Sequence, residues 1–282
     1  MASPPLSLSL SIFLLLSPLI SSASSQPFIR LPTEATKGKS TVDDDDLYCS
    51  SWHLAVETNN AGSWKTIPTR CRSYAQDYMT GQRYMSDSEI AANFSLAHAS
   101  SVEIARDGKD AWVFDVDETL LSNLKYYEDH GFGILDGDVN HVLIKILISN
   151  NTEPSEIFDD DSFNAWVDLA VAPAIPASLK LYNELKQMGF KIFLLTGRSE
   201  SQRNVTAKNL LFAGYTDWER LILRGHSDEG TKAIAYKSER RSELLDEGYR
   251  IQGNSGDQWS DLQGFAVAIR SFKLPNPMYY IA

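Results

Sequence analysis

Four short apolar runs, each followed by polar residues, restrict the possible folds of this 282-residue chain most strongly. Helical segments, such as 177–188 and 201–213, lie between the runs. Short buried strands that alternate with helices are typical of βαβ units around a parallel sheet. The pattern therefore predicts an α/β fold, and such sheets bind ligands at the carboxyl ends of their strands. The runs are 111–114, 191–195, 221–223 and 249–251.

A carboxylate-rich motif, Asp115-Val116-Asp117-Glu118-Thr119, follows the first run directly. On its own, a D-x-D-x-T motif is also typical of a polar loop. Three complementary pieces come later: a hydroxyl with a glycine (Thr196-Gly197), a cation (Lys237), and two acidic residues (Asp257 and Asp261). A carboxylate that attacks phosphorus is a weak nucleophile, so it needs positioning and charge neutralisation. The combined set therefore predicts chemistry through an aspartyl-phosphate.

These motifs, with longer matches around them, resemble the haloacid dehalogenase (HAD) superfamily of phosphohydrolases. Within it, the chain is similar to the plant acid phosphatases and vegetative storage proteins, a class B acid phosphatase-like family. The resemblance runs from about Cys49 to the C-terminus. It implies a Rossmann-like HAD fold over 48–282, with a central parallel sheet flanked by helices. It also implies a small helical accessory or cap region at about 72–106 and 124–175. The matching segments are 113–123, 193–206, 236–241, 248–262 and 271–281.

The resemblance also implies a role for each residue of the first motif. Asp115 would be the nucleophile that forms the aspartyl-phosphate. Asp117 would be the general acid and then the general base, and its backbone carbonyl would bind the metal. Thr119 would shape the loop and order Asp115.

The later motifs would complete the site. Thr196 and the backbone N–H groups around Gly197 would bind a phosphoryl oxygen, and Lys237 would balance its charge. Lys232 is also near, but the resemblance places the family lysine at 237. Together with Asp115 and Asp117, Asp257 would ligate Mg²⁺, and Asp261 would do so directly or through water.

Other residues allow two interpretations each. Arg198 would either touch the substrate or form an ion pair at the start of a helix. Tyr126, Tyr127 and Trp166 would either line a pocket for the leaving group or pack in the core.

The N-terminus is typical of a cleaved secretory signal over 1–25. Its apolar run, 6–20, is shorter than the roughly 20 residues of a membrane span, and small residues follow it. We therefore expect a secreted or vacuolar protein with no membrane attachment after cleavage; a signal anchor is the alternative. Residues 26–47 are predicted to form a flexible polar arm that ends in the solvated run 43–46.

The predicted secretion bears on the cysteines and on the glycosylation sequons. Cys49 and Cys71 are the chain's two cysteines, and in an oxidising compartment they would most simply pair. Two free thiols are the alternative. Asn93, Asn150 and Asn204 begin N-x-Ser/Thr sequons and are candidates for glycosylation.

Two segments receive more specific predictions. Residues 86–89 have the pattern of a capping box, so a helix is expected to begin there, with Ile90, Phe94 and Ala97 at helical spacing. An apparent insertion at about 138–156 departs from the family and contains a very apolar stretch. It is a lid, an added edge strand or a gene-model artefact.

The charge of the chain disfavours nucleic-acid binding. There are 37 acidic and 26 basic residues, which gives a formal net charge of −11. Such a chain repels nucleic acids at long range. Two functions remain: a Mg²⁺-dependent acid phosphatase acting on small phosphomonoesters, or a storage protein with the same fold and little turnover. The resemblance also suggests a homodimer.

Overall fold

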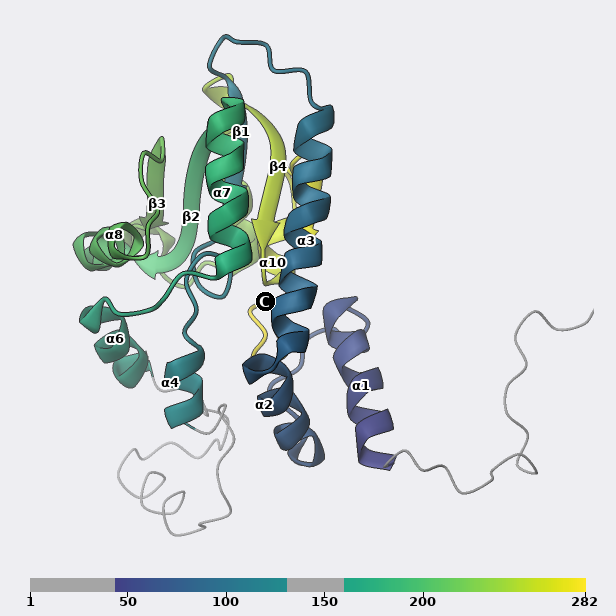
Figure 1. The fold of residues 1–282 in the computed structure, drawn as a ribbon. Coiled ribbons are helices and arrows are strands. Elements are labelled where there is room, and N and C mark those ends of the chain that lie inside the picture. The colour runs from purple at the N-terminus through teal and green to yellow at the C-terminus, as the bar shows by residue number, and fades with distance from the viewer. Residues whose placement is uncertain (1–43, 131–159) are drawn as a thin grey trace, which may run out of the picture. The chain divides into compact units, whose positions relative to one another are not determined.

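The computed structural model describes residues 44–130 and 160–282 of the chain (Figure 1). Three predicted features lie outside these residues: the signal sequence, the insertion at 138–156 with its sequon at Asn150, and most of the flexible arm. Among the described residues, none of the helices is long and apolar enough to cross a membrane.

The core is a five-stranded sheet with the order β3-β2-β1-β4-β5. Every pair of neighbouring strands is parallel. The predicted α/β fold with a central parallel sheet is therefore confirmed. The strands are β1 (Asp110–Phe114), β2 (Lys191–Ser199), β3 (Arg220–Arg224), β4 (Arg250–Gly256) and β5 (Arg270–Lys273). The predicted runs mark the first four strands, but the runs for β2 and β4 end too early, and no run marks β5.

Alternate side chains of β1 enter the cores on the two faces of the sheet, as the period of a strand requires. Trp112 and Phe114 pack in one core with Tyr182 of α7 (Pro176–Met188) and Ala99 of α3 (Gln82–Ser101). Figure 1 shows these two helices side by side over one face. Ala111 and Val113 pack in the other core.

The second face is covered by α9 (Ala233–Asp246), which contributes Tyr236 and Leu244 to its core. The remaining helices of the sheet region are α8 (Arg203–Phe212) and the short α10 (Trp259–Leu262). Two 3₁₀ turns, η4 (Glu200–Gln202) and η5 (His226–Asp228), complete the connections.

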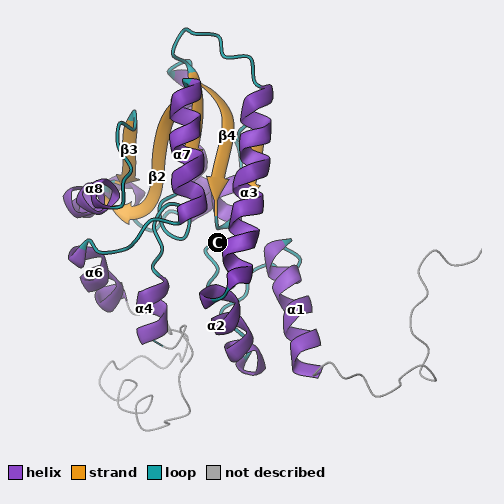
Figure 2. Cartoon of the chain, in the orientation of Figure 1, coloured by secondary structure: helices purple, strands orange, loops and turns teal. Residues whose placement is uncertain are grey.

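A group of helices lies beyond the carboxyl ends of the strands (Figure 2). It has its own aromatic core, which includes Tyr78, Tyr84, Tyr126 and Tyr127. These helices fall largely in the segments that were predicted to form an accessory region. They are α1 (Asp44–Glu57), α2 (Arg72–Thr80), α4 (Leu124–Asp129) and α6 (Asp160–Leu169), together with the first turns of α3.

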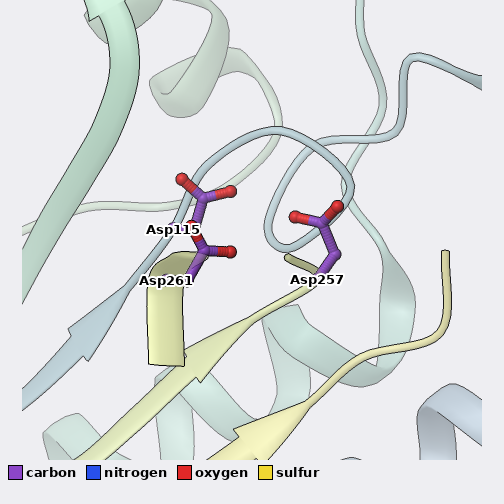
Figure 3. A group of neighbouring side chains, drawn as sticks. All are labelled: Asp115, Asp257 and Asp261. Carbon is purple, nitrogen blue, oxygen red and sulfur yellow. The ribbon is translucent and has the colours of Figure 1, made fainter. Parts of the chain in front are cut away.

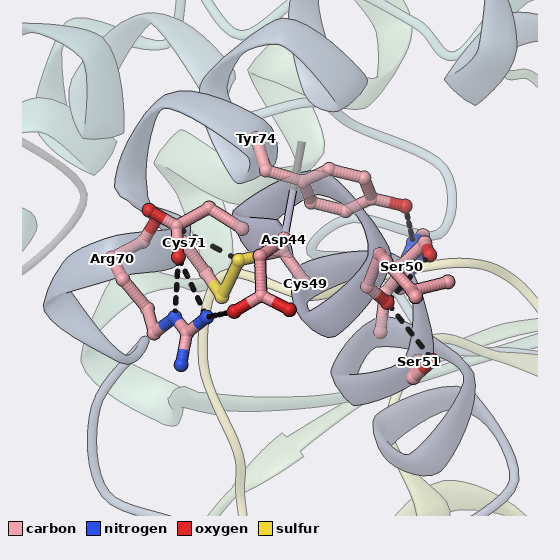
Figure 4. The surroundings of a disulfide bond; sticks show 10 residues. Asp44, Cys49, Ser50, Ser51, Arg70, Cys71 and Tyr74 are labelled. Atoms are coloured by element: carbon pink, nitrogen blue, oxygen red, sulfur yellow. Dashed lines mark hydrogen bonds and ion pairs between the residues drawn. A yellow bond between two sulfur atoms is a disulfide. The ribbon is translucent and has the colours of Figure 1, made fainter. Parts of the chain in front are cut away.

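A disulfide joins Cys49 of α1 to Cys71 of the 3₁₀ turn η2 (Thr69–Cys71), which confirms the predicted pairing (Figure 4). Both cysteines are buried. Arg70 beside the bridge forms ion pairs with Asp44 and Asp45. The N-terminal half of α1 is therefore held to η2 covalently at Cys49 and by charge at its first turn.

Two local predictions are wrong. Asp44, Asp45 and Asp46 are exposed as expected, but they form the first turn of α1 instead of a flexible arm, because negative charges stabilise the N-terminus of a helix. The helix α3 begins at Gln82, so the supposed capping box at 86–89 lies inside it.

The apolar residues that the sequence analysis placed on the helix after 86 point away from the core. Ile90 and Phe94 are more than half exposed, whereas Ser95 and Ala99 are buried. Small residues on the inner face let α3 approach its neighbours closely.

Candidate active site

The strand order brings two of the predicted motifs together. Strands β1 and β4 are neighbours, although the connections that leave them run to opposite edges of the sheet. Such a topological switch point is where open α/β sheets form their binding crevice. Asp115 follows β1 and Asp257 follows β4, so both side chains belong to this point.

Three carboxylates meet there, from Asp115, Asp257 and Asp261 of α10 (Figure 3). One oxygen from each lies within 4.8 Å of the others, and the three residues are 7%, 1% and 2% exposed. Buried oxygen donors at this spacing are the chemistry that a hard divalent cation such as Mg²⁺ prefers. The residues present therefore fit the predicted metal.

Lys237 lies against two of these carboxylates. Its Nζ donates to Asp115 Oδ1 at 2.5 Å and also to Asp261 Oδ1. The second Asp261 oxygen accepts the backbone N–H of Gln258 at 2.9 Å. Lys232, the alternative lysine, is the exposed residue before α9. The structure therefore brings Lys237 and not Lys232 to the predicted nucleophile.

The charges of the cluster shift the pKa values of its members. Burial raises the pKa of Asp115 well above its usual range, and Lys237 lowers it by less. Burial lowers the pKa of Lys237, but Asp115 and Asp261 outweigh burial, so the net shift is upward. Burial, with Asp261, raises the pKa of Asp257 to about 6. Lys237 therefore does not fully compensate the negative charge of these carboxylates, and a metal ion would supply the further positive charge.

Asp117 has partners of its own, Arg198 and Asn123. Nε and Nη2 of Arg198 both donate to its carboxylate, the shortest distance being 2.6 Å. Asn123 Nδ2 donates to Asp117 Oδ1 at 2.8 Å. Burial raises the pKa of Asp117, but Arg198 outweighs burial and the net shift is downward. Arg198 forms its ion pair from β2 and with Asp117, not at the start of a helix as one interpretation had it. Contact of Arg198 with the substrate stays a prediction. The metal contact predicted for the backbone carbonyl of Asp117 stays a prediction.

Glu118 is a buried residue of the site that the sequence analysis missed. It adopts φ = 51°, and this left-handed backbone turns the chain back after Asp117. Its carboxylate accepts the N–H of Asn123 at 2.6 Å and the hydroxyl of Tyr279 at 2.6 Å. Burial raises the pKa of Glu118 to about 8. It therefore binds the loop to the C-terminal segment.

The two predicted hydroxyls have different surroundings. Thr119 Oγ1 donates to Asp257 Oδ1 at 3.2 Å, so it contacts the metal cluster through Asp257 and not through Asp115 as expected. Thr196 is buried near the carboxyl end of β2, and its Oγ1 accepts the N–H of Arg198 at 3.1 Å. Gly197 beside it is exposed. Phosphoryl binding by this pair stays a prediction.

Two side chains from outside the motif residues hold Asp257. Gln258 Nε2 and Asn276 Nδ2 both donate to Asp257 Oδ2 at 2.7 Å. Asn276 lies after β5 in the matching segment 271–281, which is the one sequence signal that could have linked it to the site. Arg241 of α9 supports the other side of the cluster, since Nη1 donates to the backbone oxygen of Asp261.

The aromatic residues proposed for a leaving-group pocket take part in packing. Tyr126 and Tyr127 are buried in the accessory core. Trp166 of α6 is partly buried against the same core, and its Nε1 donates to Asn123 Oδ1 at 2.9 Å. Trp166 thus supports the residue that holds Asp117. Of the sequons, Asn93 on α3 and Asn204 on α8 are both exposed.

A parallel sheet with a carboxylate cluster and a lysine at its switch point defines a phosphohydrolase of the HAD class. The family model described as "HAD superfamily, subfamily IIIB (Acid phosphatase)" matches residues 34–282. The chain belongs to this acid phosphatase family.

Similar proteins agree with this assignment. Acid phosphatase 1 of Solanum lycopersicum is 51% identical, over 84% of this chain and 85% of that protein. The stem 28 kDa glycoprotein of Glycine max is 40% identical, over 84% and 85%. Vegetative storage protein 1 of Arabidopsis thaliana is 34% identical, over 83% and 78%. The class C acid phosphatase from Bacillus anthracis has a similar fold, with a TM-score of 0.54 at 20% identity over 74% of this chain and 85% of that chain.

Proposed function

We propose that this protein hydrolyses small phosphomonoesters through an aspartyl-phosphate on Asp115, with Mg²⁺ bound beside it. The observation that carries the proposal is the contact of Lys237 with Asp115 inside the cluster that Asp257 and Asp261 complete. This arrangement places a nucleophile, a fixed cation and oxygen ligands in one buried site.

The reaction has two displacements. An oxygen of Asp115 attacks phosphorus while the bond to the ester oxygen breaks, and protonated Asp117 gives its proton to the leaving alkoxide. Asp117 then removes a proton from water, whose oxygen attacks phosphorus. The bond to Asp115 breaks and inorganic phosphate leaves. Each proton that Asp117 donates is thus recovered in the second step.

The other residues of the site hold charge in place. Lys237 neutralises the oxygens of Asp115 and the phosphoryl group, and Thr196 with nearby N–H groups binds a phosphoryl oxygen. Asp115 and Asp257 would hold Mg²⁺, with Asp261 acting through water or through Lys237. When bound, the metal supplies the positive charge that lets the phosphate dianion lie among carboxylates.

The test is phosphate release from a panel of monoesters, including p-nitrophenyl phosphate, by the purified protein from residue 26 onward. We expect release with Mg²⁺, loss with EDTA, and recovery when Mg²⁺ is restored. No release from any ester between pH 4 and 8 would contradict the proposal.

A second candidate, nitrogen storage with little turnover, is favoured by the likeness to the vegetative storage proteins. The carboxylate at position 115, which the resemblance ties to catalysis, favours the enzyme. A protein that accumulates in tissue and fails the phosphate-release test would be a storage protein.

We also propose that the protein is secreted or vacuolar after removal of residues 1–25, carries glycans at Asn93 or Asn204, and forms a homodimer. The disulfide supports an oxidising compartment. N-terminal sequencing, mass spectrometry before and after glycosidase treatment, and light scattering would test the three proposals in turn. Small phosphomonoesters remain the proposed partners, and the net charge disfavours nucleic acids.

A further inference from the structure

The end of helix α1 is bonded to the segment that follows β5. Glu57 is the last residue of α1, and its Oε1 accepts the backbone N–H of Asn276 at 2.8 Å. Its Oε2 accepts a hydrogen bond from Lys273 Nζ at 2.7 Å. These contacts join residues 219 and 216 positions apart in the chain. The helix held by the disulfide therefore contacts the C-terminal segment through one carboxylate.

Asn276 carries this contact on to the carboxylate cluster. The residue is 1% exposed, and its Nδ2 donates to Asp257 Oδ2 at 2.7 Å. Its Oδ1 accepts the N–H of Met278 at 2.9 Å. Because both ends of the amide are bonded, the side chain cannot turn without losing a bond. The position of the Asn276 backbone, which Glu57 holds, thus fixes the donor to Asp257.

The location of Glu57 is electrostatically costly without its partners. A carboxylate at the last residue of a helix faces the negative end of the helix dipole. The side chain is only 20% exposed, so water compensates it poorly. Burial raises the pKa of Glu57, but Lys273 and His53 outweigh burial and the net shift is downward. The group therefore stays an acceptor for Asn276.

We propose that Glu57 is a positioning residue for the metal site, which acts through Asn276 to orient the Asp257 carboxylate. The proposal rests on the proposed function of Asp257 as a ligand of Mg²⁺. Groups that orient metal ligands through hydrogen bonds commonly contribute about 10- to 100-fold to metal affinity. Helix α1 would thereby help to position the metal ligands, although no residue of the sequence motifs lies in it.

The test is the dissociation constant for Mg²⁺, measured by titration calorimetry on the purified protein without substrate. We expect Glu57→Ala and Asn276→Ala each to weaken binding about 10-fold or more. Glu57→Gln keeps an oxygen for the Asn276 N–H and should fall between Glu57→Ala and the wild type. In a double variant, a substitution of Glu57 should not weaken Mg²⁺ binding beyond the effect of Asn276→Ala alone. The reason is that Glu57 acts on Asp257 only through Asn276.

Val56→Ala is the matched control. Val56 precedes Glu57 on α1 and is buried, so its truncation should lower the melting temperature and leave the Mg²⁺ constant unchanged. A wild-type Mg²⁺ constant in Glu57→Ala would overturn the proposal for Glu57 alone. If Glu57→Ala does not fold, the double variant Glu57→Gln with Asn276→Ala is measured instead. Weaker Mg²⁺ binding in this double variant than in Asn276→Ala alone would overturn the proposal. Absence of Mg²⁺ binding in the wild type would overturn this proposal and the proposed metal dependence together.

Discussion

Arg198 holds the carboxylate of Asp117 through two nitrogens, at 2.6 Å from Nη2 and 3.1 Å from Nε. The pair has a consequence for acid catalysis. A general acid must carry a proton, whereas Arg198 lowers the pKa of Asp117. The proposed acid is therefore protonated mainly in acidic solution, which agrees with membership of an acid phosphatase family.

Arg198→Met should move the pH profile of turnover upward. Without the guanidinium the pKa of Asp117 rises, so the protonated acid persists to higher pH and the alkaline limb of kcat shifts in that direction. The maximal kcat should fall, because Asp117 loses its orientation. A pH–rate profile with p-nitrophenyl phosphate checks both effects. Arg203→Met, which removes an exposed pair with Glu200, should leave the limb in place. An unmoved or lowered limb in Arg198→Met would contradict the assignment.

Asp115→Asn should reduce phosphate release by at least about 10²- to 10³-fold, because the amide has no anionic oxygen to attack phosphorus. Circular dichroism should show an intact fold, since the substitution hardly changes the volume. Asp129→Asn, which removes an exposed carboxylate paired with Lys125, is the control and should keep full activity. Full activity in Asp115→Asn would exclude Asp115 as the nucleophile.

Gly256→Ala should weaken Mg²⁺ binding and activity together. A Cβ at this position would lie 2.5 Å from the Oδ2 of Asp261, so that carboxylate must move. Gly253→Ala is the matched control on the same strand, because its Cβ would meet the ring of Trp112 in the core instead. That variant should lose about 1–3 kcal/mol of stability and keep its Mg²⁺ constant. Equal Mg²⁺ constants in the two variants would show that the Gly256 contact does not act on the site.

Asp110→Asn should destabilise the protein at neutral pH and much less in acid. Asp110 begins β1 and accepts hydrogen bonds from Arg250 Nε at 2.9 Å and from the N–H of Ala105 at 2.9 Å. Hydrogen bonding to Arg250 lowers its pKa to about 2. The stabilisation, about 2 kcal/mol, is therefore complete above the unfolded pKa of about 4 and decreases as the pH falls toward 2. Urea unfolding of the wild type and of Asp110→Asn from pH 3 to 6 should show a difference in unfolding free energy that becomes smaller in acid. A difference that does not change with pH would contradict the role of the Asp110 pKa.

The sequence predicted the parts of the fold that local pattern determines. Apolar runs marked β1, β2 and β3, and the motif residues marked the carboxyl ends of the strands as the location of the site. The end of β4 was not predicted because Gly253 and Asn254 are residues that strands usually avoid. They form a strand here because β1 and β5 pair with both sides of the segment. Gly253 is also needed where the ring of Trp112 passes.

Several residues of the site were not predicted, for a reason that differs from the one for β4. Asn123, Asn276 and Tyr279 act through bonds to residues far along the chain or across a backbone turn, and no periodicity encodes such contacts. Glu118 was recognised as a part of the motif, but no role was predicted for it. Its burial depends on its positive φ, which the sequence pattern does not indicate. Sequence reasoning therefore found the groups proposed to react and overlooked the groups that hold them.

The site draws on residues from Glu57 to Tyr279, and this span has a consequence for biosynthesis. A ribosome adds residues from the N-terminus at about 5–20 per second, so Asp115 is made well before Lys237, Asp257 and Asn276. A nascent chain thus carries the proposed nucleophile before it carries the groups that hold and neutralise it. We therefore expect a chain cut short before Asn276 to contain Asp115 and to release no phosphate.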